Sequence, residues 1–306
     1  MPCIIAQNRQ ETHAEWELER GEMGDMREEE RRNLFENASV AHAVAKLAIP
    51  TMIGQIIGVI YNMADTFFVG QTGSDAMLAA VTVCMPAFML LTAVANLFGV
   101  GGASAVSRAL GRHREERAGC CASFSFYGCL GATLLYSLGA FLMIDPFVNL
   151  LGGTHAAVHS LAKEYLTVTV VLGGAATSMN ALIAHLLRSE GCSMHAAIGV
   201  ITGGILNIVL DPLFMFVLLP PGREAFGAAA ATALSNVCSL AYYAVVLLRT
   251  KDSRTALHFR LNSGAFADGI PSEILSVGLP AFMMTTCENV SFAEIGKSTP
   301  ELQSRI

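Results

Sequence analysis

Charged residues are scarce in this chain. Asp, Glu, Lys and Arg together make up 14% of its 306 residues, whereas hydrophobic residues make up 53%. The mean hydropathy of +0.50 is too apolar for a soluble globular protein of this length. The composition therefore predicts an all-α polytopic membrane protein.

Several sequence signatures are also absent. Basic and aromatic residues do not cluster, so we expect no nucleic-acid partner. The eight Cys contain no C-x-x-C pair and the eight His show no metal-like grouping, so the sequence indicates neither a disulfide framework nor a certain metal site. No Lys-Ser/Thr follows the glycines at 99–102, which excludes a phosphate-binding loop and favours close helix packing. We expect no secretory signal, because the first long apolar run begins only near residue 43.

Long apolar runs are abundant instead. A window of about 19 residues predicts six membrane-spanning helices and the start of a seventh. The six lie at Leu47–Val69, Leu78–Val100, Gly119–Ile144, Leu161–Leu187, Ala197–Leu219 and Gly227–Leu248. The seventh begins near Ile274 and fades toward Ile295.

Lys and Arg are distributed unevenly between the loops. The loops after the second, fourth and sixth predicted spans carry Arg108, Arg112, Arg114, Arg117, Arg188, Arg249, Lys251, Arg254 and Arg260. The other side carries only Lys163 and Arg223. Because Lys and Arg mark the cytoplasmic face, we expect a multi-pass protein of the plasma (inner) membrane with a cytoplasmic N-terminus.

The pattern divides the chain into four parts. We expect residues 1–45 to form a cytoplasmic tail. The part from about residue 26 is either an interfacial helix or an ordinary acidic segment. Met26 is an alternative to Met1 as the natural start. Residues 46–250 are predicted to form a six-helix lobe and residues 251–273 a cytoplasmic inter-lobe loop. Residues 274–306 are predicted to start a second lobe with a truncated or divergent tail.

A short internal repeat supports this division. The sequence LAIPTMIGQ at Leu47–Gln55 is echoed by VGLPAFMMT at Val277–Thr285, and each copy places a Pro a few residues into an apolar span. Repeated helix bundles are typical of secondary transporters. Because the echo follows six spans and precedes a polar tail, we expect one complete half of a transporter and a broken start of the next. We therefore expect the chain alone not to transport.

Two acids stand alone within apolar spans. Asp65 lies in the first predicted span and Asp211 in the fifth. A carboxylate near the bilayer core costs roughly 2.5–3.5 kcal/mol, so it is retained only where it faces protein or a water-filled cavity. Helical spacing places Tyr61 beside Asp65 and Asn207 beside Asp211. The pattern indicates a proton or cation pathway, although Asp65 as a helix cap and Asp211 at a proline kink are simpler structural alternatives.

Four motifs resemble the multidrug and toxic compound extrusion (MATE) family. They are YNMADTFFVGQTG at Tyr61–Gly73, GVGGASAVSRALG at Gly99–Gly111, LRSEG at Leu187–Gly191 and NIVLDPLF at Asn207–Phe214. The resemblance covers about residues 30–290 and is strongest to the DinF-like branch. It implies the N-terminal six-transmembrane-helix lobe of a six-plus-six transporter, plus the start of a seventh helix. It also implies an antiporter that exports cationic or amphipathic drugs in exchange for H⁺ or Na⁺.

The resemblance also assigns a site. The family's cation- or proton-binding cluster maps to Tyr61, Asp65, Asn207 and Asp211, with Thr232 on the sixth span as a fifth member. Paired acids of this kind titrate as a unit. When both acids are deprotonated, their carboxylates and the amide oxygen of Asn207 would offer ligands to Na⁺; these residues are Asp65, Asn207 and Asp211. The implied partners are small cationic or amphipathic substrates, membrane lipid, and either a missing second lobe or a second copy. The coupling ion takes the place of any cofactor.

Three alternatives stand beside this reading. A flippase of related fold for a lipid-linked oligosaccharide would need basic grooves, and Asp65 with Asp211 argues against it. An intramembrane aspartyl protease would need Gly-x-Gly-Asp, whereas Ile208-Val209-Leu210 precede Asp211. The sequence therefore predicts no enzyme. A non-functional truncated product is compatible with every one of these readings.

Overall fold

A computed structural model describes residues 40–220, 222–250 and 269–298, and within these ranges the chain is helical with no strand. The long helices are α2 (Val40–Gln71), α3 (Asp75–Gly111), α4 (Glu115–Leu142), α7 (Gly174–Ser189), α8 (Ser193–Pro212), α9 (Glu224–Thr250) and α10 (Ile270–Ser298). The shorter elements are α5 (Ile144–Leu151), α6 (Ala156–Leu166) and two π-helical turns, η2 (Thr167–Leu172) and η3 (Leu213–Leu218).

The described helices confirm a polytopic membrane protein. Six of them are long and apolar enough to cross a membrane, and a seventh crossing results if α6 to η2 and α7 count as one bent span. The predicted first, second and sixth spans lie inside α2, α3 and α9. The seventh begins earlier than predicted, because α10 starts at Ile270. The predicted tail helix from about residue 26 lies outside the described residues, as does the inter-lobe loop up to residue 268.

The fourth predicted span, Leu161–Leu187, is not one straight helix. Its two halves meet at Gly173 and are bent by 49°. The turn before the bend is π-helical, so Gly173 N–H donates to Val168 O at 2.8 Å. The widened turn leaves one carbonyl exposed to a neighbouring helix, and Ser137 Oγ of α4 donates to Val170 O at 2.8 Å. Hydropathy alone could not predict this break, because every residue of the turn is apolar or a membrane-compatible Thr.

Two other predicted spans are also interrupted. The fifth, Ala197–Leu219, ends as an α-helix at Pro212 and continues as the π-helical turn η3. Pro212 has no N–H to donate, and such breaks are tolerated in membrane helices where other groups compensate the backbone. The third, Gly119–Ile144, ends as α4 at Leu142, and a separate short helix, α5, begins at Ile144.

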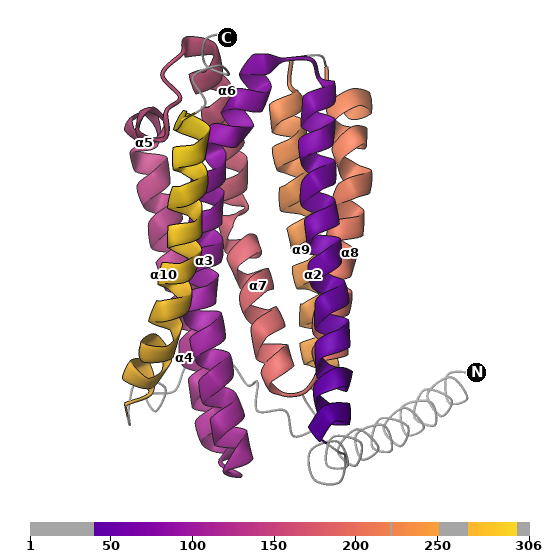
Figure 1. Ribbon diagram of the computed structural model, residues 1–306, viewed down its shortest axis with the longest axis vertical. Helices are drawn as coiled ribbons and strands as arrows, with labels where there is room; N and C mark the ends of the chain where they lie inside the picture. Colours follow the sequence, from indigo (N-terminus) through magenta and orange to yellow (C-terminus); the bar gives the residue numbers. More distant parts are fainter. Residues whose placement is uncertain (1–39, 221, 251–268, 299–306) are drawn as a thin grey trace, which may run out of the picture.

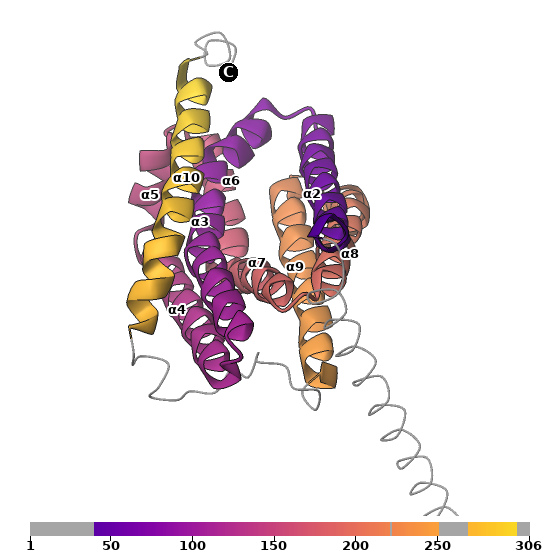
Figure 2. The same ribbon diagram turned by 60° about the horizontal axis from the view of Figure 1, so that its bottom comes forward.

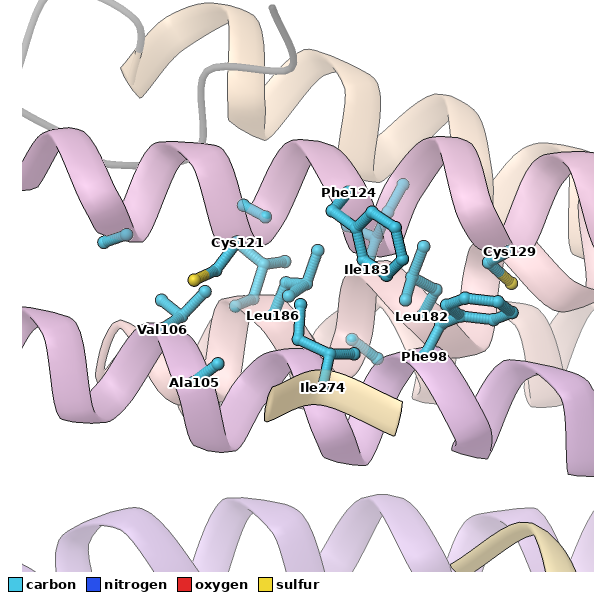
Figure 3. Close-up of a cluster of buried hydrophobic side chains, with 14 of the residues drawn as sticks. Phe98, Ala105, Val106, Cys121, Phe124, Cys129, Leu182, Ile183, Leu186 and Ile274 are labelled. Carbon is cyan, nitrogen blue, oxygen red and sulfur yellow. The ribbon is translucent and has the colours of Figure 1, made fainter. Parts of the chain in front are cut away.

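The helices form two groups joined by α7. In both Figure 1 and Figure 2, α3, α4 and α10 lie together on one side, while α2, α8 and α9 lie together on the other. One hydrophobic cluster joins α3, α4, α7 and α10 (Figure 3), with members that include Phe98, Val106, Cys121, Phe124, Leu182, Leu186 and Ile274. A second cluster includes Val69, Met77, Leu91, Val148, Tyr165, Leu166 and Met215. Because lipid is as apolar as Leu, close packing rather than water exclusion favours these contacts.

Candidate functional site

Small residues allow α2 and α8 to lie side by side. Gly54 of α2 lies beside Ala197 and Val200 of α8, and Gly204 of α8 lies beside Ile57 and Tyr61 of α2. Because the residue numbers of the contacting pairs rise together, with offsets of 143 to 147, the two helices run parallel. The same register places Asp65 at the level of Ile208, between Asn207 and Asp211.

Asn207 and Asp211 form the buried part of the site. Their exposed fractions are 2% and 0%. Asn207 Nδ2 donates to Asp211 Oδ1 at 3.1 Å, the i to i+4 contact predicted for one helix face. The same nitrogen lies 3.5 Å from Thr232 Oγ1 of α9, so Thr232 joins the cluster from a third helix.

Asp65 and Tyr61 complete the cluster from α2. Asp65 is half-buried and lies within electrostatic range of Asp211. Tyr61 packs against Gly204 and lies within electrostatic range of both acids. The structure therefore brings together all five residues that the sequence singled out.

Three buried oxygens of this cluster accept no hydrogen bond from the described residues. They are Asp65 Oδ1, Asn207 Oδ1 and Asp211 Oδ2. Leaving a buried acceptor unsatisfied costs about 1–3 kcal/mol, and two neighbouring negative charges add repulsion. A proton bound by one of the two acids removes this repulsion. A small hard cation does the same, because carboxylate and amide oxygens are its preferred ligands.

Sequence reasoning missed Tyr165 of α6. Its side chain is 5% exposed and lies within electrostatic range of Asp65, Asp211 and Tyr61. Tyr165 also belongs to the second hydrophobic cluster. Tyr165 gives no sequence signal, because its relation to the two acids arises only from the fold.

A hydrogen-bond chain extends the cluster toward α7. Asn236 of α9 donates to Thr232 O at 3.0 Å and to Thr177 Oγ1 of α7 at 3.2 Å. Asn180 Nδ2 in turn donates to Asn236 Oδ1 at 3.0 Å. Helical spacing places Thr232 and Asn236 on one helix face, and likewise Thr177 and Asn180. These polar pairs could have been predicted from the sequence. The polar path thus runs from Asp211 to the middle of the lobe.

The predicted close packing at glycines 99–102 is confirmed. A Cβ at Gly101 would lie 2.2 Å from Ile274 O of α10, and one at Gly102 would lie 2.1 Å from Ser125 Oγ of α4. The obstacle at Gly101 is backbone, so no side chain fits there, and any side chain at Gly102 would displace Ser125. The glycines therefore serve helix contact in a region separate from the acidic cluster.

Comparison with known proteins identifies the family. Residues 50–213, more than half of the chain, match the MatE family model. The chain belongs to the MATE family. It is 30% identical over 263 residues to the multidrug export protein MepA of Staphylococcus saprophyticus, an alignment that covers 86% of this chain and 56% of MepA. It is 29% identical over 257 residues to MepA of Staphylococcus aureus strain MRSA252, covering 84% and 55%.

Solved structures of MATE transporters are also similar. The crystal structure of MATE in complex with MaD3S superposes with a TM-score of 0.75 at 32% identity, covering 83% of this chain and 55% of that chain. A MOP superfamily transporter from Pyrococcus furiosus superposes with a TM-score of 0.71 at 32% identity, covering 83% and 54%. The chain spans about half the length of the curated relatives it matches. The DinF-like branch stays a prediction.

Proposed function

We propose that this chain forms the ion-binding half of a secondary active antiporter, which exports cationic or amphipathic drugs across the plasma membrane in exchange for H⁺ or Na⁺. The N-terminus is cytoplasmic in this proposal. The observation that carries it is the set of three buried oxygens on Asp65, Asn207 and Asp211 that accept no hydrogen bond within the described chain. Thr232 contacts Asn207 through its hydroxyl, and Tyr61 lies within electrostatic range of both acids.

Ion binding would change the contact between α2 and α8. Without the ion, the carboxylates of Asp65 and Asp211 repel each other across a region of low dielectric. A proton or Na⁺ removes this repulsion and favours closer approach of the two helices. The ion therefore has different affinities for the two arrangements, which is the requirement for coupling. Tyr165, buried beside both acids, would limit where the charges can move.

The free face of α2 suits a drug-sized cation. Met52 and Met63 are 61% and 68% exposed, and Gln55 and Asn62 are exposed on the same helix. Flexible Met side chains accommodate varied apolar shapes, which favours promiscuous binding. Polar groups and the nearby carboxylates supply attraction for positive charge.

The flippase alternative is less favoured by the same helices. After Lys46, α2 carries no Lys or Arg, and α8 carries none at all. An anionic lipid-linked sugar needs positive charge on the wall of its path, whereas this wall is acidic. The proposal therefore keeps drug export as the function.

Ethidium efflux tests the proposal. Since the relatives are nearly twice as long as the aligned part of this chain, efflux is measured in a chimera in which residues up to Asn289 continue with the second half of S. aureus MepA. Asp65→Asn should reduce efflux to the level of the empty vector with normal expression, because Asn cannot release a proton or offer a charge. Asp211→Asn should act in the same direction.

Asp75→Asn is the matched control, because Asp75 is exposed at the first turn of α3. Its efflux should equal that of the parent chimera. Wild-type efflux by the Asp65→Asn chimera would contradict the assignment of the site. A parent chimera that inserts normally but exports no ethidium would contradict drug export itself.

A further inference from the structure

The short helix α5 is held at one end of the lobe by few apolar contacts. Figure 1 shows α5 and α6 at the same end as the turn between α2 and α3. Val148 is the one buried residue of α5, and Phe147 meets Tyr136 of α4 edge-on with ring centroids 6.3 Å apart. Leu150, by contrast, is 76% exposed. Polar contacts must therefore contribute to fixing α5 on its neighbours.

These polar contacts come from one face of α6. Lys163 Nζ donates to Asp145 Oδ1 of α5 at 2.7 Å, and His159 Nε2 lies 3.2 Å from the same oxygen. The other ring nitrogen of His159, Nδ1, lies 3.1 Å from Gly153 O in the turn between the two helices. Because His159 and Lys163 are four residues apart, they share a helix face. One turn of α6 thus holds both α5 and the connection to it.

Both contacts of the His159 ring are with hydrogen-bond acceptors. Gly153 offers a carbonyl, and Asp145 is ionised beside the Lys163 ammonium. Since Gly153 is buried, the neutral imidazole satisfies its carbonyl best with the single proton on Nδ1. Nε2 then directs a lone pair at the carboxylate oxygen of Asp145, which is repulsive. A second proton, on Nε2, turns this contact into a charge-assisted hydrogen bond.

Other ionisable groups near this end of α6 have separate contacts. His155 is exposed at the N-cap of α6, and the π-helical turn η2 carries no ionisable side chain. On α3, Asp75 is exposed and the thiol of Cys84 donates to Ala162 O. Glu224, in the first turn of α9, accepts from Gly222 N–H. Within the described ranges, Asp145 and Lys163 are therefore the charges that act on His159 at close range.

The contacts of α6 continue along three consecutive residues. Lys163 binds α5, and Glu164 accepts from Arg223 at the start of α9. Tyr165 follows directly and lies within electrostatic range of the two acids of the candidate site. A change in the contact with α5 therefore acts on the turn of α6 that borders the acidic cluster.

We propose that His159 and Asp145 form a proton-operated clasp that fastens α5 to α6. With Nε2 protonated, His159 donates to Gly153 and Asp145 together and holds α5 in place. Without that proton only Lys163 retains Asp145, and α5 gains freedom to move. Histidine exchanges such a proton between neutral and mildly acidic pH. The clasp rests on the proposed function only for its side of the membrane, because a cytoplasmic N-terminus places it at the outer surface.

A distance measurement on the 306-residue chain tests the clasp without transport. Spin labels are placed at Leu150 of α5 and Val217 of η3, both exposed, in a chain whose native cysteines are replaced. Leu142, at the end of α4 before α5, gives the reference pair with Val217. In lipid nanodiscs the Leu150–Val217 distribution should be narrow at mildly acidic pH and broaden at mildly alkaline pH. The Leu142–Val217 distribution should stay unchanged.

Two histidine variants locate the response. His159→Gln cannot take up the proton, so it should lose the difference between the two pH values. His155→Gln is the matched control, because His155 is exposed at the N-cap of α6 and makes no side-chain cap hydrogen bond. It should keep the full response. A Leu150–Val217 distribution that does not change with pH in the unsubstituted chain, or a response that survives in His159→Gln, would overturn the proposal.

The protonation state of His159 can be read directly by ¹⁵N NMR. The spectrum of the histidine-labelled chain minus that of His159→Gln isolates its two ring nitrogens. Both should carry a proton at mildly acidic pH, and only Nδ1 at mildly alkaline pH. A ring that stays neutral, or stays doubly protonated, over this range would overturn the clasp. Neither measurement uses efflux, so a chimera that exports nothing would contradict the proposed function and leave the clasp to be decided here.

Discussion

The two polar clusters of the lobe are built in opposite ways. In the first turn of α10, both oxygens of Glu273 accept from Arg108 and Arg117 at 3.1 and 2.9 Å. Between α2 and α8, Asp65 and Asp211 each leave a buried oxygen without a donor in the described chain. A carboxylate whose partners are supplied by the protein stabilises structure, whereas a carboxylate short of partners is free to take a proton or an ion. The same chemical group, a carboxylate, thus has opposite hydrogen-bonding environments in the two clusters.

The helices around the two clusters also differ in how tightly they pack. α3 and α10 touch through their backbones at Gly101 and Gly278. α2 instead contacts mainly α8 and leaves large side chains such as Met52 and Met63 more than half exposed. A tight interface holds one arrangement, and a looser helix can shift when the charge beside it changes. Asp65 and Tyr61 of the acidic cluster lie on α2, the more loosely packed of these helices.

Adding one methyl group at Gly278 should have the largest effect on stability. In Gly278→Ala the new Cβ meets Leu97 O at 1.8 Å, so the two helix backbones must separate. We expect a loss of about 1–3 kcal/mol, typical of overpacking. The thermal midpoint in detergent, followed with a thiol-reactive fluorescent dye, measures it. Gly131→Ala on α4 is the matched control, because a Cβ there meets no atom within 4 Å and the midpoint should not fall. Equal midpoints for both variants would contradict the tight interface.

Removing the charge of Glu273 should have a smaller effect. Its side chain is 29% exposed and those of Arg108 and Arg117 are 42% and 31% exposed, so solvent screens the pairs. We expect Glu273→Gln to cost about 0.2–1 kcal/mol per ion pair, with the cost decreasing as salt concentration rises. Thermal midpoints at low and high salt measure it, and exposed Glu115→Gln on α4 serves as the control. A cost that salt does not reduce would indicate that these pairs do not act through their charge.

The smallest expected effect concerns Asp145 of α5, outside the membrane spans. Hydrogen bonds from Lys163 and His159 lower the pKa of Asp145 below its ordinary value. A carboxylate with a lowered folded-state pKa contributes stability above its unfolded pKa, and this contribution is lost as the pH falls through the folded pKa. Asp145→Asn should therefore lower the thermal midpoint slightly at neutral pH and not at strongly acidic pH. A deficit that is the same at both pH values would contradict this linkage.

Much of the fold was predictable because hydropathy reports it directly. The spans that became α2, α3 and α9 needed only an uninterrupted apolar run. The bend at Gly173 was not predictable, because a π-helical turn depends on how Ser137 of α4 meets Val170 O. Likewise, the early start of α10 reflects burial of Ile270 in the lobe's core, which no window of hydropathy measures.

The acidic cluster was more predictable than its surroundings. An acid in a membrane span is costly, so the isolated acids Asp65 and Asp211 predicted the site. Helical spacing then placed Tyr61 beside Asp65 and Asn207 beside Asp211. Tyr165 was missed, because an uncharged side chain carries no such cost. Only the fold brings it within electrostatic range of the two acids.

Thermal stability of the purified 306-residue chain as a function of pH and Na⁺ tests the central claim most directly. A ligand that binds only the folded state raises the midpoint by mass action. If Asp65, Asn207 and Asp211 hold a proton or Na⁺, the thermal midpoint should rise on mild acidification or when Na⁺ replaces choline in the buffer. The double variant Asp65→Asn with Asp211→Asn should lack that rise. An equal response of the wild type and the double variant to both ions would contradict the account.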